Sequence, residues 1–544
     1  MTATAPIEKP EQFDAIIVGA GFAGMYMLHR LRQQGLKVRV LERAAGVGGT
    51  WYWNRYPGAR CDVESIEYSY TFDDKLQQEW EWSERYATQP EILRYLNHVA
   101  DRFDLRSDIQ FETSVNSAEY DEPSRQWLIS TLQGQRYAAR YFIAASGVLS
   151  EPNLPRYPGQ ERFAGKIYYT YHWPHESVDF TDKRVAVIGT GSSAIQSIPL
   201  IAAQAKHLTV LQRTPNFSVP ACNRALGAEE IAKIKAEYPR RRQHLLQQHF
   251  AFNLYVNGQN TLQATAQERE RELERRWSVF GGLQFLGAYA DVLFDAQANH
   301  EVAEFIRRKI RQIVKDPKTA DMLTPKDHPV GCKRLCSDTG YFETFNRDNV
   351  ELIDIREQPI TGFEANGIRY GDALVQADII VCATGFDAIT GALLKMNISG
   401  RGGATLRERW LHGAQSYLGL TTVDFPNLFT ITGPGSPSVL SNVVMSIEDH
   451  VDWIANCIAF LEREGITCIE PTATLQQAWM DEVLATARPT QFTACNSWYS
   501  GANVAGKPRS FTAYVGFTDY RNKIAKIAED NYATFQLSRD ALTV

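Results

Sequence analysis

A short apolar segment at residues 15–18 runs directly into a glycine. An apolar run of this length, ended by glycine, is typical of a buried strand. Apolar residues at helical spacing follow at residues 25–34, and Gly35 separates them from a second apolar strand at residues 38–41. A strand, a helix and a strand within about 30 residues form a complete βαβ unit, which predicts a parallel sheet.

The same order of elements recurs about 170 residues later along the chain. A strand is predicted at residues 184–188, a helix at 195–204 and a strand at 208–211. Two such units, too far apart to be a short repeat, predict an α/β fold with two Rossmann-like dinucleotide-binding domains. The later predicted elements are strands at 350–355 and 378–381 and helices at about 446–464 and 517–530.

Residues 214–330 differ from both units because they are charged, helix-prone and poor in β-branched runs. This composition predicts a helical insertion within the second unit. Its two charge runs, at residues 239–242 and 267–272, are interpreted as solvated helix faces. The polar N-terminal residues 1–12 are expected to be disordered. The expected domains are 1–148 with 387–544, then 149–213 with 331–386, and the insertion at 214–330.

Composition and charge exclude several classes of protein. The 57 Lys and Arg residues against 63 Asp and Glu give a net charge of −6, which disfavours nucleic-acid binding. No apolar run approaches the ~18 residues that a membrane span needs, and the N-terminus lacks a signal-peptide pattern. The eight cysteines show no metal-binding or C-x-x-C spacing. We therefore expect reduced thiols, no metal site and a cytoplasmic location.

The first glycine-rich turn, Gly19-x-Gly21-x-x-Gly24, lies between the first strand and the first helix. The first glycine permits the tight turn, the second lets a pyrophosphate approach the backbone, and the third lets helix and strand pack closely. The helix N-terminus then offers N–H groups to the phosphates. Glu42 ends the second strand, where a carboxylate binds ribose hydroxyls and repels a 2′-phosphate. A further glycine pair at residues 48–49 favours FAD over NAD at this turn.

The second glycine-rich turn, Gly189-x-Gly191-x-x-Ala194, also joins a strand to a helix. The next strand ends at Arg213 and Thr214 without an acidic residue. A cation and a hydroxyl at this place suit a 2′-phosphate, so we expect NADPH in the second domain and FAD in the first. Flavin disulfide reductases are disfavoured, because the cysteine that follows the first turn has no partner nearby. The chain is therefore expected to be an NADPH-dependent flavoprotein.

Residues 163–174 carry a pattern close to the fingerprint F-x-G-x-x-x-H-x-x-x-W-P. The histidine of the fingerprint falls on Tyr169, and His172 lies three positions later. The positions that match are Phe163, Gly165, Trp173 and Pro174. Other matching segments lie at residues 49–58, 383–387, 433–436 and 498–503. Together these motifs resemble the Baeyer–Villiger monooxygenase family over about residues 13–538, and within it the phenylacetone and steroid monooxygenases.

The resemblance implies an enzyme that turns a ketone, dioxygen and NADPH into an ester or lactone, water and NADP⁺. In this family NADPH reduces FAD, and a C4a-peroxyflavin then attacks the ketone. Arg334 stands where the family places its catalytic arginine, and Asp62 where it places the carboxylate that pairs with it. A guanidinium is always protonated in proteins, so it suits a site that must hold an oxygen anion.

The resemblance also assigns residues to the two cofactors. Lys333 is expected to help Arg213 and Thr214 hold the 2′-phosphate, and Trp498 to contact the ribose beside the nicotinamide. The full set of expected cofactor-binding residues is Gly19, Gly21, Gly24, Glu42, Gly49, Thr50, Trp51, Asp62, Tyr68, Val115, Val443, Gly189, Thr190, Gly191, Ser192, Ser193, Gln196, Arg213, Thr214, Lys333, Arg334 and Trp498.

Tyr169 keeps an aromatic ring and a hydrogen-bonding hydroxyl but lacks the charge switch of histidine near neutral pH. We hypothesise that activity is retained and that NADPH handling is altered. Two other functions remain open: a flavin monooxygenase that oxidises amine or sulfide heteroatoms, and a non-catalytic redox sensor. The expected partners are a small ketone and dioxygen, without nucleic acid or membrane, and the chain is expected to be a monomer or weak homo-oligomer.

Overall fold

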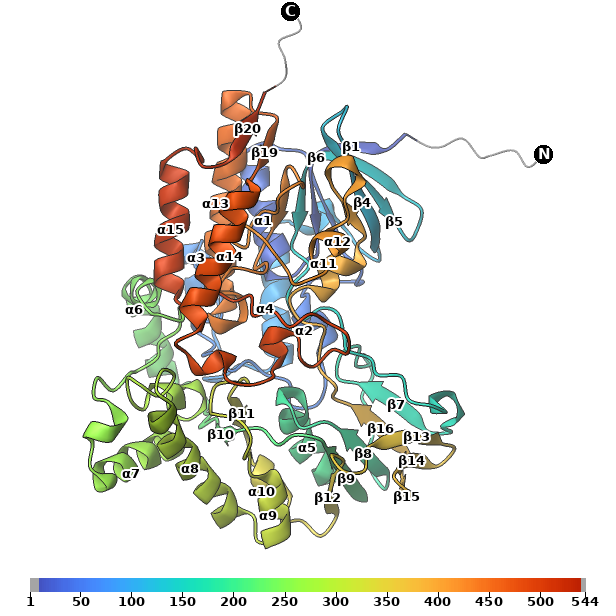
Figure 1. Ribbon diagram of the computed structural model, residues 1–544, viewed down its shortest axis with the longest axis vertical. Coiled ribbons are helices and arrows are strands. Elements are labelled where there is room, and N and C mark those ends of the chain that lie inside the picture. Colours follow the sequence, from blue (N-terminus) through green and yellow to red (C-terminus); the bar gives the residue numbers. More distant parts are fainter. Residues whose placement is uncertain (1–8, 540–544) are drawn as a thin grey trace, which may run out of the picture.

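The computed structural model describes residues 9–539 and stacks two α/β parts along the long axis of the molecule (Figure 1). The upper part contains an eight-stranded sheet, and the lower part contains a five-stranded sheet with the helices of residues 214–330 beside it. The α/β fold with two Rossmann-type sheets is therefore confirmed. Within the described residues, no helix is both long and apolar enough to cross a bilayer.

The upper sheet begins with β1 (Glu11–Val18), which lies between two parallel neighbours. Val18 is level with Leu41 of β2 on one side and with Ala144 of β6 on the other. After β1 the chain forms β2 on one side of it and later forms β6 on the other side. The carboxyl end of β1 is therefore a topological switch point. The other strands are β2 (Val38–Leu41), β3 (Ile109–Gln110), β4 (Val115–Asp121), β5 (Gln126–Thr131), β6 (Arg136–Ala144), β17 (Ile398–Ser399) and β18 (Leu428–Thr430).

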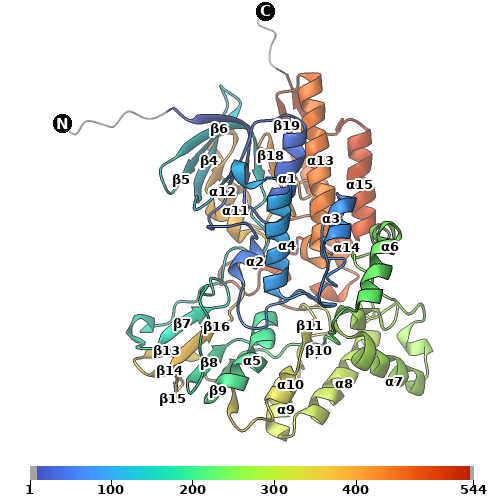
Figure 2. The ribbon, with the colours of Figure 1, turned by 180° about the vertical axis from the view of Figure 1, so that it is seen from behind.

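Helices cover the upper sheet, and the longest of them comes from the C-terminal third of the chain. α13 packs against α1, and Figure 2 shows α1 and α4 running beside α13 and α15. The helices of this part are α1 (Phe22–Gln33), α2 (Thr50–Trp53), α3 (Asp74–Glu79), α4 (Gln89–Arg102), α11 (Gly391–Lys395), α12 (Leu406–Arg409), α13 (Val443–Glu464), α14 (Ala473–Ala487) and α15 (Phe517–Glu529).

The lower sheet is entirely parallel, in the order β12-β9-β8-β16-β7. The central strands β8 and β16 are near-continuous apolar runs because helices or further chain cover both faces. Ile188 of β8 is level with Leu211 of β9 and Cys382 of β16, so three strands end at one edge. The elements are β7 (Lys166–Tyr169), β8 (Arg184–Ile188), β9 (His207–Gln212), β12 (Val350–Asp354), β16 (Ile379–Cys382), α5 (Ser192–Gln204), α10 (Tyr341–Thr344) and the small antiparallel sheet β13 (Ile360–Glu364), β14 (Gly367–Tyr370) and β15 (Ala373–Gln376).

Residues 214–330 are mainly helical, as expected, and a short strand, β10 (Ser218–Pro220), pairs with β11 (Cys336–Asp338) across them. The expectation of a solvated face at residues 239–242 is wrong for Arg242, which is buried. Its guanidinium donates hydrogen bonds to Gln77 and Ser69 of the upper part. One arginine of this charge run therefore faces inward, although its neighbours in the sequence are charged as well. The helices are α6 (Ala228–Leu246), α7 (Ala266–Arg275), α8 (Ala296–Ile313) and α9 (Pro317–Leu323).

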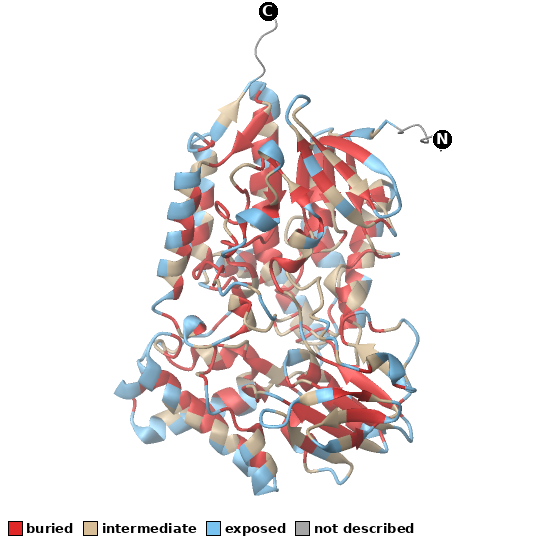
Figure 3. Ribbon diagram, turned by 45° about the vertical axis from the view of Figure 1, so that its right-hand side comes forward, coloured by how far each residue is buried: buried red, intermediate tan, exposed pale blue. Residues whose placement is uncertain are grey.

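Most predicted elements occur within a few residues of their expected bounds. The N-terminal expectation is wrong for Glu11 and Gln12, which belong to β1, and residues 1–8 of that prediction lie outside the described residues. The first helix begins at Phe22 rather than residue 25, because Gly21 takes an extended conformation immediately before it. In Figure 3 the buried residues follow both sheets and the inner faces of the helices. One continuous apolar cluster includes residues of both parts, such as Ile17 of β1 and Val187 of β8.

Candidate active site

A cavity of about 1290 Å³ lies between the two parts. Pockets for a single drug-sized ligand usually have ~300–1,000 Å³, so this cavity has room for more than one such ligand. It is lined by the glycine-rich turns of both sheets and by segments from residues 333–334 and 496–505. All of the expected cofactor-binding residues line it except Gly24.

The first glycine-rich turn is shaped by close backbone contacts. Gly19 has φ +104°, and a Cβ there would lie 2.6 Å from the carbonyl oxygen of Ala145. A Cβ on Gly24 would lie 1.7 Å from the carbonyl oxygen of Gly19. Gly24 therefore lets α1 approach β1, and it does not touch the cavity. Gly21 precedes α1 without a side-chain cap, so the first N–H groups of the helix remain available to an anion.

Glu42 is buried at the end of β2 and has two backbone partners. One carboxylate oxygen accepts the N–H of Ala20 at 2.6 Å, and the other accepts the N–H of Ala44 at 2.8 Å. Burial raises the pKa of Glu42, whereas these hydrogen bonds lower it. The carboxylate holds the turn in shape, and each oxygen keeps a further lone pair for a ribose hydroxyl.

The second glycine-rich turn has the same backbone geometry as the first, but the strand that follows it ends in a cation instead of an acid. Gly189 has φ +112°, and a Cβ there would lie 2.5 Å from the carbonyl oxygen of Ala383. At the end of β9, Arg213 is exposed and has no ion-pair partner within residues 9–539. The hydroxyl of Thr190 donates to the carbonyl oxygen of Thr214 at 2.8 Å, which joins the turn to this strand end. The two turns thus present an acid and a cation at equivalent places.

Arg334 and Asp62 meet in the cavity from distant parts of the chain. Nε and Nη2 of Arg334 donate to the two oxygens of Asp62 at 2.8 and 2.9 Å, a bidentate pair. Nη1 donates to the carbonyl oxygen of Val439 at 3.0 Å. Burial alone would lower the pKa of Arg334, but the charge and hydrogen bonds of Asp62 outweigh it and raise this pKa. The side chain is 19% exposed, so the fixed cation still faces the cavity.

Lys333 and Trp498 lie beside this pair. Nζ of Lys333 donates to the carbonyl oxygen of Asn496 at 2.7 Å, two residues before Trp498. Burial lowers the pKa of Lys333, an effect that Asp327 partly offsets. The segment that carries Arg334 is therefore joined to the segment that carries Trp498 at the cavity wall.

Comparison with known proteins decides the family. A pyridine nucleotide-disulphide oxidoreductase family model matches residues 16–240, which include both glycine-rich turns. A Baeyer–Villiger monooxygenase from Pseudooceanicola batsensis is 43% identical, over 97% of each chain. The phenazine N-monooxygenase PhzNO1 from Lysobacter antibioticus is 41% identical, also over 97% of each chain. The solved structure of an oxidised steroid monooxygenase bound to NADP is 50% identical and covers 97% of this chain and 100% of its own, with a TM-score of 0.93.

The chain belongs to the Baeyer–Villiger monooxygenases. It is accordingly an FAD-containing, NADPH-dependent monooxygenase that converts ketones to esters or lactones.

The fingerprint of this Baeyer–Villiger monooxygenase begins just before the edge strand β7, includes it and continues after it. The hydroxyl of Tyr169 accepts a hydrogen bond from Nε2 of Gln160 at 2.5 Å, and burial raises the pKa of Tyr169. His172 has φ +64° and stacks on Trp53, with ring centroids 4.4 Å apart. Burial, followed by the charge of Arg43, lowers the pKa of His172 to about 4. Both aromatic residues are therefore uncharged at neutral pH.

The expectation that all cysteines are reduced is wrong for two of them. Cys332 and Cys495 form a disulfide between positions 163 residues apart. Each cysteine is isolated in its own stretch of sequence, so spacing alone did not reveal the pair. Among the described residues six cysteines remain free, and Cys61 is one of them.

Two residues of this Baeyer–Villiger monooxygenase were not singled out by sequence reasoning. Tyr499 is buried and its hydroxyl is hydrogen-bonded to Arg334. Asn216 lines the cavity, and its Oδ1 is buried without a hydrogen-bond partner among the described residues. Tyr499 lies within the matching segment 498–503, which was the available signal, whereas nothing in the sequence around Asn216 indicated its position.

Proposed function

We propose that FAD binds the first glycine-rich turn, that NADPH binds the second, and that the ketone is oxidised beside Arg334. The domain of residues 1–148 with 387–544 would then hold FAD, and that of 149–213 with 331–386 would hold NADPH, with 214–330 as the helical insertion. The contrast between Glu42 and Arg213 supports this order, because an acid repels a 2′-phosphate and a cation attracts it.

The residues present fit two dinucleotides. Each turn has a glycine where a Cβ would strike a carbonyl oxygen, and each is followed by a helix whose N-terminal N–H groups have no side-chain cap. These are the features by which a helix N-terminus holds a pyrophosphate. When bound, FAD would take hydride from NADPH and supply the chemistry that activates dioxygen.

The Arg334–Asp62 pair carries the proposal for catalysis. Oxygen transfer to a ketone places negative charge on oxygen, and a fixed cation in a partly buried site stabilises such charge strongly. Asp62 engages two of the five guanidinium N–H groups and orients the rest, while it offsets the cost of burying the cation. Because its pKa is raised, Arg334 acts as a constant charge and not as a proton donor.

Replacement of the arginine tests this role. Arg334→Ala is expected to keep FAD and to oxidise NADPH, but to form ester at least ~100-fold more slowly, because one lost oxyanion donor costs this much or more. Ester should be measured by gas chromatography beside NADPH consumption and hydrogen peroxide. Arg240→Ala, an exposed arginine of the insertion, is the control. Ester formation at the parental rate in Arg334→Ala would contradict the assignment.

A second candidate is oxidation of a heteroatom. The 41% identity to phenazine N-monooxygenase PhzNO1 supports it, since that relative is named for oxygen transfer to nitrogen. A cationic site suits a nucleophilic oxygen that attacks a carbonyl, whereas nitrogen and sulfur need an electrophilic oxygen. Product analysis with an aryl ketone and an aromatic N-heterocycle under the same conditions distinguishes the two. Heteroatom oxidation would therefore be an activity beside ketone oxidation, which the Arg334–Asp62 pair favours.

We also propose a cytoplasmic enzyme that is a monomer or weak homo-oligomer and binds no nucleic acid. The need for NADPH and the net charge of −6 support this proposal. Light scattering after size-exclusion chromatography at two protein concentrations would test the oligomeric state.

A further inference from the structure

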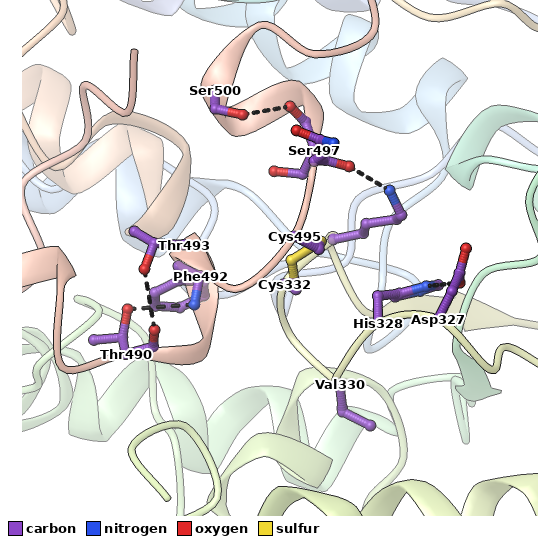
Figure 4. The surroundings of a disulfide bond; sticks show 12 residues. Asp327, His328, Val330, Cys332, Thr490, Phe492, Thr493, Cys495, Ser497 and Ser500 are labelled. Carbon is purple, nitrogen blue, oxygen red and sulfur yellow. Dashed lines mark hydrogen bonds and ion pairs between the residues drawn. A yellow bond between two sulfur atoms is a disulfide. The ribbon is translucent and has the colours of Figure 1, made fainter. Parts of the chain in front are cut away.

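The Cys332–Cys495 disulfide joins two segments that both line the cavity. Cys332 directly precedes Lys333 and Arg334, and Cys495 lies three residues before Trp498. Figure 4 shows the bond between the loop before β11 and the C-terminal segment that carries Ser497 and Ser500. The bond therefore connects the proposed catalytic cation with the segment whose Trp498 is expected to contact the ribose beside the nicotinamide.

The Cys332 side of the bond is firmly held. Asn299 of α8 accepts the N–H of Val330 at 2.9 Å and donates to its carbonyl oxygen at 2.8 Å. Asn299 and Cys332 are both almost fully buried. This loop is consequently a fixed anchor.

The Cys495 side is held much less. Between α14 and α15 the described chain forms only two single-turn helices, Gln491–Thr493 and Trp498–Ser500. Residues 494–497 make one hydrogen bond to a part of the described chain outside 490–502, which is the contact between Lys333 and the carbonyl oxygen of Asn496. The hydroxyl of Ser497 is buried without a partner among the described residues. Apart from packing, residues 494–497 are therefore tied to the rest of the described chain by the disulfide and the Lys333 hydrogen bond.

We propose that Cys332 and Cys495 form a reversible redox clamp that controls how tightly the enzyme retains NADP⁺. In the oxidised state the bond holds the segment around Trp498 against the anchor at residues 332–334. In the reduced state residues 494–497 keep only the Lys333 hydrogen bond, while Tyr499 stays bonded to Arg334, and the loosened backbone before Trp498 releases the dinucleotide more readily. The inference rests on the proposed placement of the dinucleotide at the second glycine-rich turn.

Reduction is a two-electron exchange, and the partial exposure of Cys495 makes it feasible. Cys332 is fully buried, whereas Cys495 is partly exposed and is followed by exposed Asn496. A dithiol attacks Sγ of Cys495, the bond to Sγ of Cys332 breaks, and Cys332 leaves as a thiolate. The second thiol of the reductant then forms its own disulfide and releases Cys495. Hydrogen peroxide reverses the change, because two thiols and one peroxide give the disulfide and two waters.

The clamp can be tested on the full-length, FAD-loaded enzyme. One sample is oxidised with hydrogen peroxide, and another is reduced with dithiothreitol, which is then removed under nitrogen. When each sample is then unfolded and alkylated, mass spectrometry should find six free cysteines in the oxidised form and eight in the reduced form. NADP⁺ affinity, measured by isothermal titration calorimetry, should fall roughly five- to tenfold on reduction, at the low end of usual couplings between sites.

Two variants sharpen the test. Cys495→Ser should show the lower affinity whether or not it is treated with dithiothreitol. Cys222→Ser removes a free, partly exposed cysteine that does not line the cavity, and it should respond to reduction as the parent does. The comparison of the oxidised and reduced parent enzyme needs no substitution. The proposal can therefore be tested even if a variant folds poorly.

Three results would overturn the clamp. Equal NADP⁺ affinity in the oxidised and reduced parent enzyme would overturn it alone and leave the proposed function intact. A disulfide that dithiothreitol opens only in denaturant would show a permanent structural bond. Absence of NADP⁺ binding in every form would overturn the placement of the dinucleotide, and the clamp with it.

Discussion

Arg213 and Glu42 occupy equivalent places at the ends of β9 and β2. Glu42 is buried and already accepts two backbone N–H groups, whereas Arg213 is exposed and unneutralised within residues 9–539. An unpaired cation at a dinucleotide turn attracts a 2′-phosphate without first breaking an ion pair. The preference for NADPH over NADH is therefore expected to depend on Arg213.

Arg213→Ala is expected to raise the KM for NADPH roughly 10- to 100-fold, since hydrogen bonds to charged groups contribute about 1.5–3 kcal/mol. The KM for NADH should hardly change, because NADH lacks the 2′-phosphate. Stopped-flow measurement of flavin reduction with each nucleotide checks both values. Arg213→Lys, which keeps the charge, should lose less; an equal loss with NADH would refute the role.

How far single residues could be predicted depends on how local their constraint is. Gly19 and Gly24 follow from one turn, whose backbone contacts leave no room for a Cβ. The pairing of Arg334 with Asp62 spans 272 positions and came only from the family resemblance. The Cys332–Cys495 bond was predicted neither from local turn geometry nor from the family resemblance, because it depends on how two distant segments pack.

At the scale of elements, glycines in the two turns have different purposes. Gly24 lies inside α1, where a Cβ would lie 1.7 Å from the carbonyl oxygen of Gly19. Gly191 precedes α5 with φ −85°, and a Cβ there would meet no atom within 4 Å. Gly24 is thus required for the packing of α1 on β1, whereas Gly191 leaves space for a ligand.

Gly24→Ala is expected to push α1 away from β1, so the protein should lose FAD and unfold at a lower temperature. Gly191→Ala should keep the parental Tm and FAD, yet bind NADP⁺ more weakly, since its methyl group enters the space of the phosphates. Thermal scans and calorimetric titration with NADP⁺ measure the pair. The idea fails if Gly24→Ala keeps its FAD and Tm, or if Gly191→Ala binds NADP⁺ normally.

Element α13 is joined to the loop after residue 70 by a buried carboxyl group. Glu448 accepts the N–H and the hydroxyl of Thr71 and the N–H of Phe72. The pKa of Glu448 is raised to about 7, chiefly by burial and in small part by the charge of Asp452, against the opposing hydrogen bonds from Thr71 and charge of Arg242. The folded protein therefore binds a proton at Glu448 that the unfolded chain has lost by this pH.

Because the pKa is higher in the folded state, Glu448 favours folding most at low pH, and this contribution is lost as pH rises from about 4.5 to about 7. Glu448→Gln should flatten the dependence of Tm on pH across this window. Calorimetric scans at half-unit steps of pH measure it, and an unchanged slope in the variant would contradict the account.

Element types could be predicted because strand and helix periods are local. Element partners were harder: β17 and β18 come from the last third of the chain, yet they complete the first sheet beside β4 and β6. Short strands of two or three residues carry too little pattern to reveal such pairings. The two-sheet architecture was predictable because the βαβ unit occurs twice.

At the scale of the whole molecule, the insertion connects the two parts through α6. Nε of Arg242 donates to Oε1 of Gln77 at 3.0 Å, and Nη2 donates to Oγ of Ser69 at 2.8 Å. The guanidinium also reaches the carbonyl oxygen of Glu67 at 3.3 Å. A cation on an inserted helix thus satisfies polar groups of the upper part, which bears one wall of the cavity.

The neighbouring arginines of this charge run allow a matched test. Arg242→Ala leaves these polar groups unpaired, so it should destabilise the protein by about 2–3 kcal/mol, the cost of removing a hydrogen-bonded buried cation. Arg240, whose side chain is 78% exposed, should tolerate alanine within ~0.5 kcal/mol. Denaturation in urea compares the two variants at one protein concentration. If both lose the same stability, α6 does not connect the parts through Arg242; if only Arg242→Ala also loosens FAD, the connection extends to the cavity wall.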